Sequence, residues 1–144
     1  MSVDVAQLFT MSQSDIDSLF RQAQAGPVPD GPSRGTAIIA PGTPCTADLA
    51  QCINLFVWQG KVFDAAHGRL INRIGVFGVN AVIADVYKAP SWFDQQECIV
   101  LDYSRTSFIA QRIRDEIRLL QPKFYLGRMY WDRQPLMNFT LQFD

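Results

Sequence analysis

The sequence predicts an α+β fold in which helices accompany a curled antiparallel sheet or small β-barrel. The clearest evidence is the run at 136–143, where polar residues alternate with the apolar residues Met137, Phe139, Leu141 and Phe143. This period of two is typical of a strand with one buried face. Further runs of this kind follow through short turns, whereas residues 106–120 show the apolar spacing of a helix. With 144 residues, of which 48% are hydrophobic, the chain is predicted to form one domain over residues 1–144.

The N-terminal part of the chain is predicted to contain helices and one short strand. Residues 1–25 are expected to be helical, because apolar residues recur at helical spacing at Leu8, Met11, Ile16, Leu19 and Phe20. Residues 26–35, GPVPDGPSRG, contain three prolines and three glycines, which is typical of a loop. The segment TAIIA at 36–40 predicts a strand, and a helix is expected at 46–56.

The rest of the chain is predicted to be mostly strands. The strand-like runs lie at 57–64, 70–77, 80–88, 97–104, 123–131 and 136–143. One helix is predicted at about 106–120, since Ile109, Ile113 and Ile117 fall on one side of a helical projection. Consecutive strands with short turns favour an antiparallel barrel, and the interior of a barrel of this size can hold one small ligand.

Composition excludes several classes of function. A net charge of −1 lacks the excess of basic residues expected for nucleic-acid binding. The three cysteines lack CxxC spacing and there is one histidine, so we expect no metal site and no cofactor. No apolar stretch approaches the roughly 18 residues needed to cross a bilayer, which predicts no membrane span. The beginning of the chain lacks a basic, apolar leader, and we therefore expect a cytoplasmic protein.

Two short motifs point to catalysis only weakly. Residues 31–35 match G-x-S-x-G, the pattern that presents a nucleophilic serine between a strand and a helix. Here the pattern follows a proline-rich segment and precedes a predicted strand, so a turn is the better interpretation. His67 lies beside Gly68 between two predicted strands. We interpret it as a turn residue, with a catalytic role as the alternative because histidine is the residue type whose unperturbed pKa lies nearest to neutral pH.

Several polar residues stand among apolar neighbours. Asp102 interrupts the run CIVLDYS at 98–104, and Tyr103 follows it. Strand parity places Asp102 and Tyr103 on opposite faces of the sheet. Arg112 and Glu116 lie four residues apart at the border of the apolar side of the predicted helix.

These groups allow two interpretations. In one they form an internal ion-pair network that holds the predicted helix on the sheet. In the other a carboxylate in apolar surroundings acts as general acid or base beside a bound anionic group. The candidates for the acid or base are Asp102, Asp115 and Glu116. The candidates for binding the anion or donating a hydrogen bond are Arg73, Arg112, Arg128, Tyr103 and Tyr130.

A set of short segments resembles a known bacterial family. These segments are WQGKVFD (58–64), INRI (71–74), VLDYS (100–104), RDEIR (114–118) and YLGRMYW (125–131). They resemble the small proteins in which a GXWXG segment precedes a domain of unknown function; this chain has Ser33 at the position of the family's tryptophan. The resemblance implies a lipocalin-like (calycin) barrel with an internal cavity for a small hydrophobic molecule. It also marks positions of interest at Trp58, Gly60, Lys61, Asp102, Asp115 and Gly127.

The function expected from these observations is the binding of a hydrophobic or amphipathic small molecule inside a barrel. The residues expected to contact it are Trp58, Lys61, Arg73, Tyr103, Arg112, Arg128 and Tyr130. The alternative is a cofactor-free lyase, isomerase, cyclase or hydrolase that acts on a small apolar or aromatic substrate, because carboxylate, arginine and tyrosine suffice for proton transfer. A homodimer formed through an apolar sheet face is a further expectation.

Overall fold

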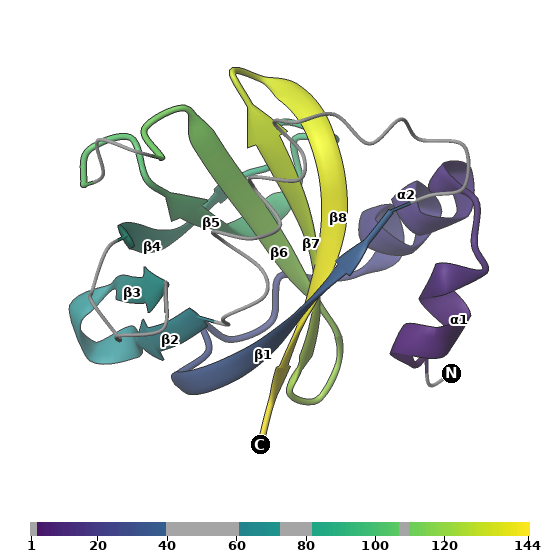
Figure 1. Cartoon of the computed structure of the whole chain (residues 1–144), viewed down its shortest axis with the longest axis horizontal. Coiled ribbons are helices and arrows are strands. Elements are labelled where there is room, and N and C mark those ends of the chain that lie inside the picture. The colour runs from purple at the N-terminus through teal and green to yellow at the C-terminus, as the bar shows by residue number, and fades with distance from the viewer. Residues whose placement is uncertain (1–2, 40–60, 73–81, 107–109) are drawn as a thin grey trace.

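A closed antiparallel barrel forms the body of the molecule (Figure 1). The computed structural model describes residues 3–39, 61–72, 82–106 and 110–144, and within these ranges eight strands pair in sequence order, with β8 closing on β1. The predicted α+β fold with a small barrel is confirmed. The elements are α1 (Val5–Phe9), α2 (Gln13–Gln22), β1 (Gly31–Ile38), β2 (Lys61–Asp64), η2 (Ala65–His67), β3 (Arg69–Asn72), β4 (Val82–Pro90), β5 (Glu97–Asp102), β6 (Ile113–Gln121), β7 (Phe124–Trp131) and β8 (Gln134–Phe143).

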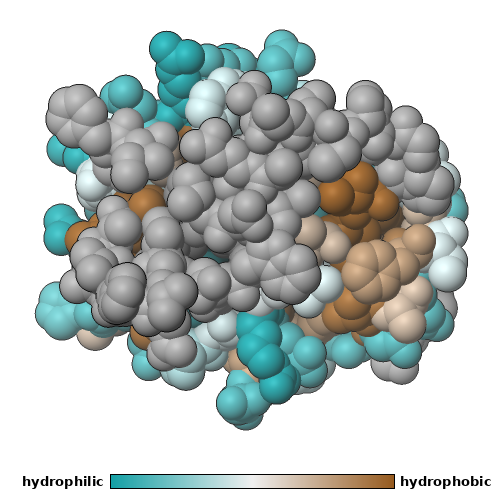
Figure 2. All heavy atoms as spheres, viewed as in Figure 1, coloured by the Kyte–Doolittle hydropathy of each residue, from teal (hydrophilic) through white to brown (hydrophobic). Residues whose placement is uncertain are grey.

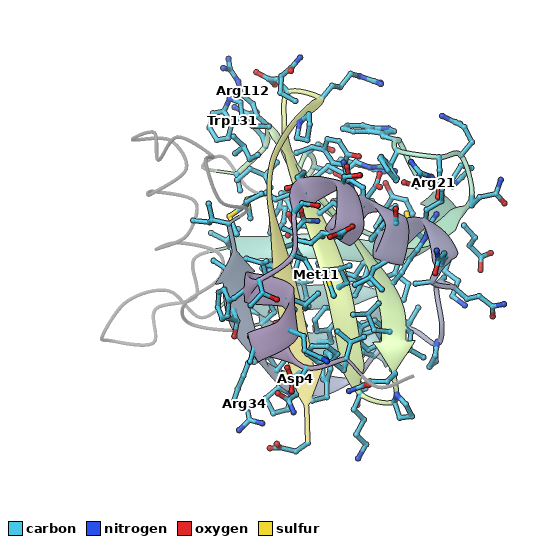
Figure 3. All side chains as sticks on the ribbon, turned by 90° about the vertical axis from the view of Figure 1, so that its right-hand side faces the viewer. Asp4, Met11, Arg21, Arg34, Arg112 and Trp131 are labelled. Atoms are coloured by element: carbon cyan, nitrogen blue, oxygen red, sulfur yellow. The ribbon has the colours of Figure 1, made fainter. Side chains whose placement is uncertain are left out.

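The two N-terminal helices lie against the outside of the barrel (Figures 1 and 3). Asp4 and Gln7 form a capping box at the start of α1, and the Ser12 side chain accepts a hydrogen bond from the Asp15 N–H at the start of α2. The apolar sides of both helices bury Leu8, Ile16 and Phe20 against outward-facing residues of the barrel, which are Ile38, Phe124 and Leu126. The barrel therefore has two buried layers, one inside and one beneath the helices.

The loop predicted at 26–35 is wrong from Gly31 onward, because β1 begins there. Among the described residues, the first two residues of β1 pair with β2 and the remaining six pair with β8. Pro32 cannot donate a backbone hydrogen bond, and it lies near the start of the strand, where proline is tolerated. Ser33 of the G-x-S-x-G pattern lies within this strand, where its hydroxyl donates to the Lys61 carbonyl oxygen at 2.7 Å.

The helix predicted at 106–120 is also wrong, because residues 113–121 form β6. Ile113 and Ile117 share a face in a strand as well as in a helix, so their spacing does not separate the two structures. Pairing with β5 on one side and β7 on the other decides the outcome. As a strand, β6 directs Asp115 to the inside of the barrel and its other charged residues to the outside.

The other predicted strands are confirmed within the described residues, at β2, β3, β4, β5, β7 and β8. The helix predicted at 46–56 lies outside these residues. Tight turns join the last three strands: Lys123 adopts a positive φ between β6 and β7, as do Asp132 and Arg133 between β7 and β8.

In Figure 2, hydrophobic surface gathers toward the side of the molecule on which the helices lie. Within the described ranges no helix has the length and apolar character needed to cross a bilayer.

Candidate functional site

The inside of the barrel, called the lumen below, is lined mainly by apolar side chains. Residues of alternate parity on each strand point inward, and they pack into one continuous cluster. Gly127 is part of this lining, since a Cβ atom there would lie 2.2 Å from the Phe139 ring. Members of the cluster include Phe63, Leu70, Ile99, Leu101, Ile117, Met129, Phe139 and Leu141.

Three polar side chains enter this apolar interior from three parts of the barrel. Lys61 comes from the start of β2, Tyr103 directly follows β5, and Asp115 comes from β6. Their exposed fractions are 1%, 0% and 0%. We call these residues the lumen trio. The Lys61 Nζ lies 2.8 Å from the Tyr103 Oη and 3.5 Å from the Asp115 Oδ2.

The Asp115 carboxylate is incompletely satisfied. Neither of its oxygens accepts a hydrogen bond of good geometry from the described residues. Lys61 and Tyr103 come near enough to influence its charge, but the 3.5 Å separation from Lys61 exceeds the 2.7–2.9 Å typical of a charge-assisted hydrogen bond. A buried carboxylate in this state has lost its hydration without full replacement, which is energetically costly.

Burial dominates the protonation of both charged members of the trio. Removal from water raises the pKa of Asp115 to about 6, against the opposing influence of Lys61 and Tyr103. Burial likewise lowers the pKa of Lys61, and the neighbouring Asp115 opposes that change. Each group is thus shifted toward its neutral form, so both can exchange protons closer to neutral pH than their exposed counterparts.

The remaining predicted acid–base candidates lie outside the lumen. The Asp102 carboxylate accepts hydrogen bonds from the Tyr87 hydroxyl at 2.7 Å and from the Ser104 N–H at 2.9 Å. The predicted opposite orientation of Asp102 and Tyr103 is confirmed, since Tyr103 belongs to the lumen cluster. His67 is exposed in the turn after β2, where Asp64 Oδ2 lies 2.7 Å from its Nδ1.

Glu116 is buried, but on the outer side of β6. Its carboxylate accepts hydrogen bonds from the Ser91 hydroxyl at 2.5 Å, the Trp92 N–H at 2.9 Å and the Arg114 Nε at 3.0 Å. The Arg112–Glu116 pair predicted for a helix is therefore wrong. Arg112 is instead exposed at one end of the molecule, with its Nη1 3.5 Å from Asp132 (Figure 3).

The predicted anion-binding residues on β7 also face outward. The Arg128 Nη1 lies 2.6 Å from Asp17 of α2, and the guanidinium stacks 4.0 Å from the centre of the Phe93 ring. Tyr130 lies beside it and accepts a 3.3 Å hydrogen bond from Arg128 Nε. Both are buried beneath α2 and the turn after β4 rather than directed toward the lumen. Trp58 and Arg73 lie outside the described residues.

One outer cleft does bring Asp102 and Arg112 together. It has a volume of ≈ 270 Å³, and the guanidinium groups of Arg114 and Arg133 both stack on the Trp92 ring, at 4.2 and 4.5 Å from its centre. Asp102 and the arginines Arg112 and Arg114 already have partners within the protein. This cleft is therefore a weaker candidate than the lumen trio.

The sequence singled out all three members of the trio, but not their proximity. Lys61 was marked by the family resemblance, and Asp115 and Tyr103 as isolated polar candidates. The signal that could have placed Asp115 inside the barrel is the parity of 113–119 as a strand. In a strand, Asp115 is the one polar residue on the face that carries Ile113, Ile117 and Leu119. Among the described residues, His, Cys, Asp and Glu do not gather in a group of three that could hold a metal ion.

Comparison with known proteins supports the fold alone. No protein-family model matches the chain, and no curated protein sequence matches it. The chain is similar to the crystal structure of a protein from Thermomonospora curvata, with a TM-score of 0.61. The two are 18% identical, and the match covers 93% of this chain and 88% of the other. Resemblance to the GXWXG-segment proteins therefore stays a prediction.

Proposed function

We propose that the barrel binds a small amphipathic molecule in its lumen, with the polar group of that molecule against Lys61, Tyr103 and Asp115. One observation carries this proposal: the Asp115 carboxylate is fully buried in an apolar interior without accepting a well-formed hydrogen bond from the described residues. Ligand sites are typically lined by apolar side chains, with a few polar groups that fix the orientation of the ligand. The lumen has this composition, since the lumen trio lies among apolar residues.

The main competing explanation is that the trio is a structural ion pair. Paired charges inside proteins are retained most readily when short hydrogen bonds compensate the loss of water. The 3.5 Å distance between Lys61 and Asp115 provides weak compensation, and both pKa shifts favour the neutral forms. A ligand group placed beside Asp115 would supply the hydrogen-bond partner that its carboxylate lacks among the described residues. The structural explanation leaves that carboxylate without such a partner.

The proposal can be tested with native mass spectrometry and a fluorescent ligand. The purified protein should retain a small molecule under native conditions, or bind N-phenyl-1-naphthylamine, an apolar probe with one N–H donor. Asp115→Asn should weaken probe binding about tenfold, since a hydrogen bond to a charged group contributes about 1.5–3 kcal/mol. The same spectra would report whether the protein is the homodimer expected from sequence.

Glu116→Gln is the matched control. It makes the same charge change at the adjacent residue, whose side chain lies on the outer side of β6. Probe affinity should stay within about twofold of the wild type, provided that circular dichroism shows both variants folded. The proposal would be refuted if the purified protein neither retained a small molecule nor bound the probe. It would also be refuted if both variants lost probe affinity equally.

Acid–base catalysis on the bound molecule is the second candidate function. It is favoured by the pKa of Asp115 near 6, because a group that titrates near neutral pH both gives and takes protons efficiently. The two functions differ in what Asp115→Asn does to the bound molecule. In a carrier, wild type and variant retain molecules of the same structure. In an enzyme, the variant retains unreacted substrate, which the wild type converts to product.

A further inference from the structure

We propose that Lys61 forms a reversible imine with an aldehyde or ketone bound in the lumen. This inference rests on the proposed function and narrows the ligand to amphipathic carbonyl compounds. The geometry that supports it is an amine in an apolar interior, 2.8 Å from a phenol and 3.5 Å from a carboxylate that come from other parts of the barrel.

The position of Lys61 distinguishes it from the other lysines of the chain. Lys61 is 1% exposed, whereas Lys88 and Lys123 are exposed on the surface. An amine attacks a carbonyl carbon only in its neutral form, and lysines in apolar surroundings are those that serve as nucleophiles. Burial lowers the pKa of Lys61 and thereby enlarges the neutral fraction of its amine.

Asp115 provides the proton transfers that the dehydration step of imine formation needs. The amine nitrogen adds to the carbonyl carbon, and one proton passes from nitrogen to oxygen to give a carbinolamine. Asp115 in its protonated form then donates to the leaving hydroxyl group, so that water departs as the C=N bond forms. The second nitrogen proton returns to the Asp115 carboxylate. The balance is one amine and one carbonyl compound to one imine and one water, without oxidant or reductant.

The surroundings of the amine favour the imine over its hydrolysis products. Phe139 lies on one side, with the Lys61 Nζ 5.9 Å from the centre of its ring, and the Tyr103 ring centre is 5.5 Å away. Both rings are fully buried, so an imine formed here is shielded from water. The same rings offer apolar contact to the carbon chain or ring of the bound compound.

Reductive trapping tests the inference on the wild-type protein. Decanal is added with sodium cyanoborohydride, which reduces an imine to a stable secondary amine, and the lysine-containing peptides are quantified by mass spectrometry. We expect Lys61 to be alkylated at least about tenfold faster than Lys88 or Lys123, because burial lowers the pKa of its amine and the lumen holds the aldehyde beside it. Lys61→Met should lose the fast reaction, and Lys88→Met should keep it.

Decanol separates failure of this inference from failure of the proposed function. It has the same chain length but no carbonyl group, and its binding by native mass spectrometry reports entry into the lumen without chemistry. If decanol binds and Lys61 reacts no faster than Lys88 and Lys123, the imine is refuted and the binding function stands. If decanol does not bind and Lys61 does not react, both are refuted. Because the peptide map uses the wild type, misfolding of Lys61→Met would not affect this result.

Discussion

The barrel wall carries buried charges on both of its faces, and the two sets are satisfied very differently. On the outside, the Arg118 side chain is fully buried and uses all five of its N–H donors. Two bonds of 2.7 Å reach Asp94, and three reach the backbone carbonyl oxygens of Phe20, Gln96 and Glu97. On the inside, Asp115 has an ammonium group at 3.5 Å and no well-formed hydrogen bond among the described residues.

This difference shows in the pKa values of the two carboxylates. The hydrogen bonds from Arg118 lower the pKa of Asp94, because they stabilise its charged form. Burial raises the pKa of Asp115, because its partners do not replace the lost water. A saturated network joins α2, the turn after β4 and β6 into one structure, whereas an unsaturated group in an apolar interior is available to a ligand. The predictions below test this contrast.

The largest effect is expected outside the barrel, from Arg118→Met. This change removes five hydrogen bonds and leaves Asp94 without its ion-pair partner, so the free energy of unfolding should fall by about 4 kcal/mol. Adding Asp94→Ala should recover little, because three carbonyl oxygens still lack the donor that Arg118 supplied. Chemical denaturation monitored by tryptophan fluorescence measures both values. Full recovery in the double variant would show that the network is a simple ion pair.

Inside the barrel, Lys61→Met should lower the free energy of unfolding by about 3 kcal/mol, since it removes the ammonium group beside the Asp115 carboxylate in an apolar interior. Here the double variant with Asp115→Val should return to within about 1 kcal/mol of the wild type, because apolar residues replace a weakly compensated pair. The same denaturation experiment provides the measurement. Failure of the double variant to recover would mean that the lumen trio stabilises the fold as the outer network does.

The pH dependence of stability should have opposite signs for the two carboxylates. A raised pKa favours folding when Asp115 is protonated, so its contribution is present below about pH 4 and is lost as the pH rises through about 6. The change relative to Asp115→Asn should be about 2–3 kcal/mol. For Asp94, whose pKa is lowered, stability is present above about pH 4 and is lost below it. Denaturation curves of wild type, Asp115→Asn and Asp94→Asn from pH 3 to pH 8 test both signs.

The smallest effect is expected for Arg112→Ala. The Arg112 side chain is 62% exposed and its ion pair with Asp132 spans 3.5 Å, so the free energy of unfolding should change by less than about 0.5 kcal/mol. Probe binding should not change, because Arg112 lies outside the barrel. Thermal denaturation and the fluorescence titration check these expectations. A clear loss of affinity would assign the ligand to the outer cleft that Arg112 lines.

The fold was predictable where one structure alone explained the pattern. In β8 the alternation of Met137, Phe139 and Leu141 with polar residues fits only a strand, and the structure has a strand there. In β6 the residues Ile113 and Ile117 fit both a strand and a helix, so the local pattern could not decide. The candidate site was likewise predictable only in part. The residues of the lumen trio were recognised as candidates from the sequence, but their proximity depends on β6 being a strand that directs Asp115 inward.

The sequence by itself determined the fold class, the opposite orientation of Asp102 and Tyr103, and the residue types available for chemistry. These depend on strand period and composition, which are local properties. Only the tertiary structure decided that residues 113–121 pair as a strand, and that Lys61, Tyr103 and Asp115 meet in the lumen while Glu116 and Arg118 lie outside. Barrel closure brings together residues more than 40 positions apart, and no local pattern encodes which of them will touch.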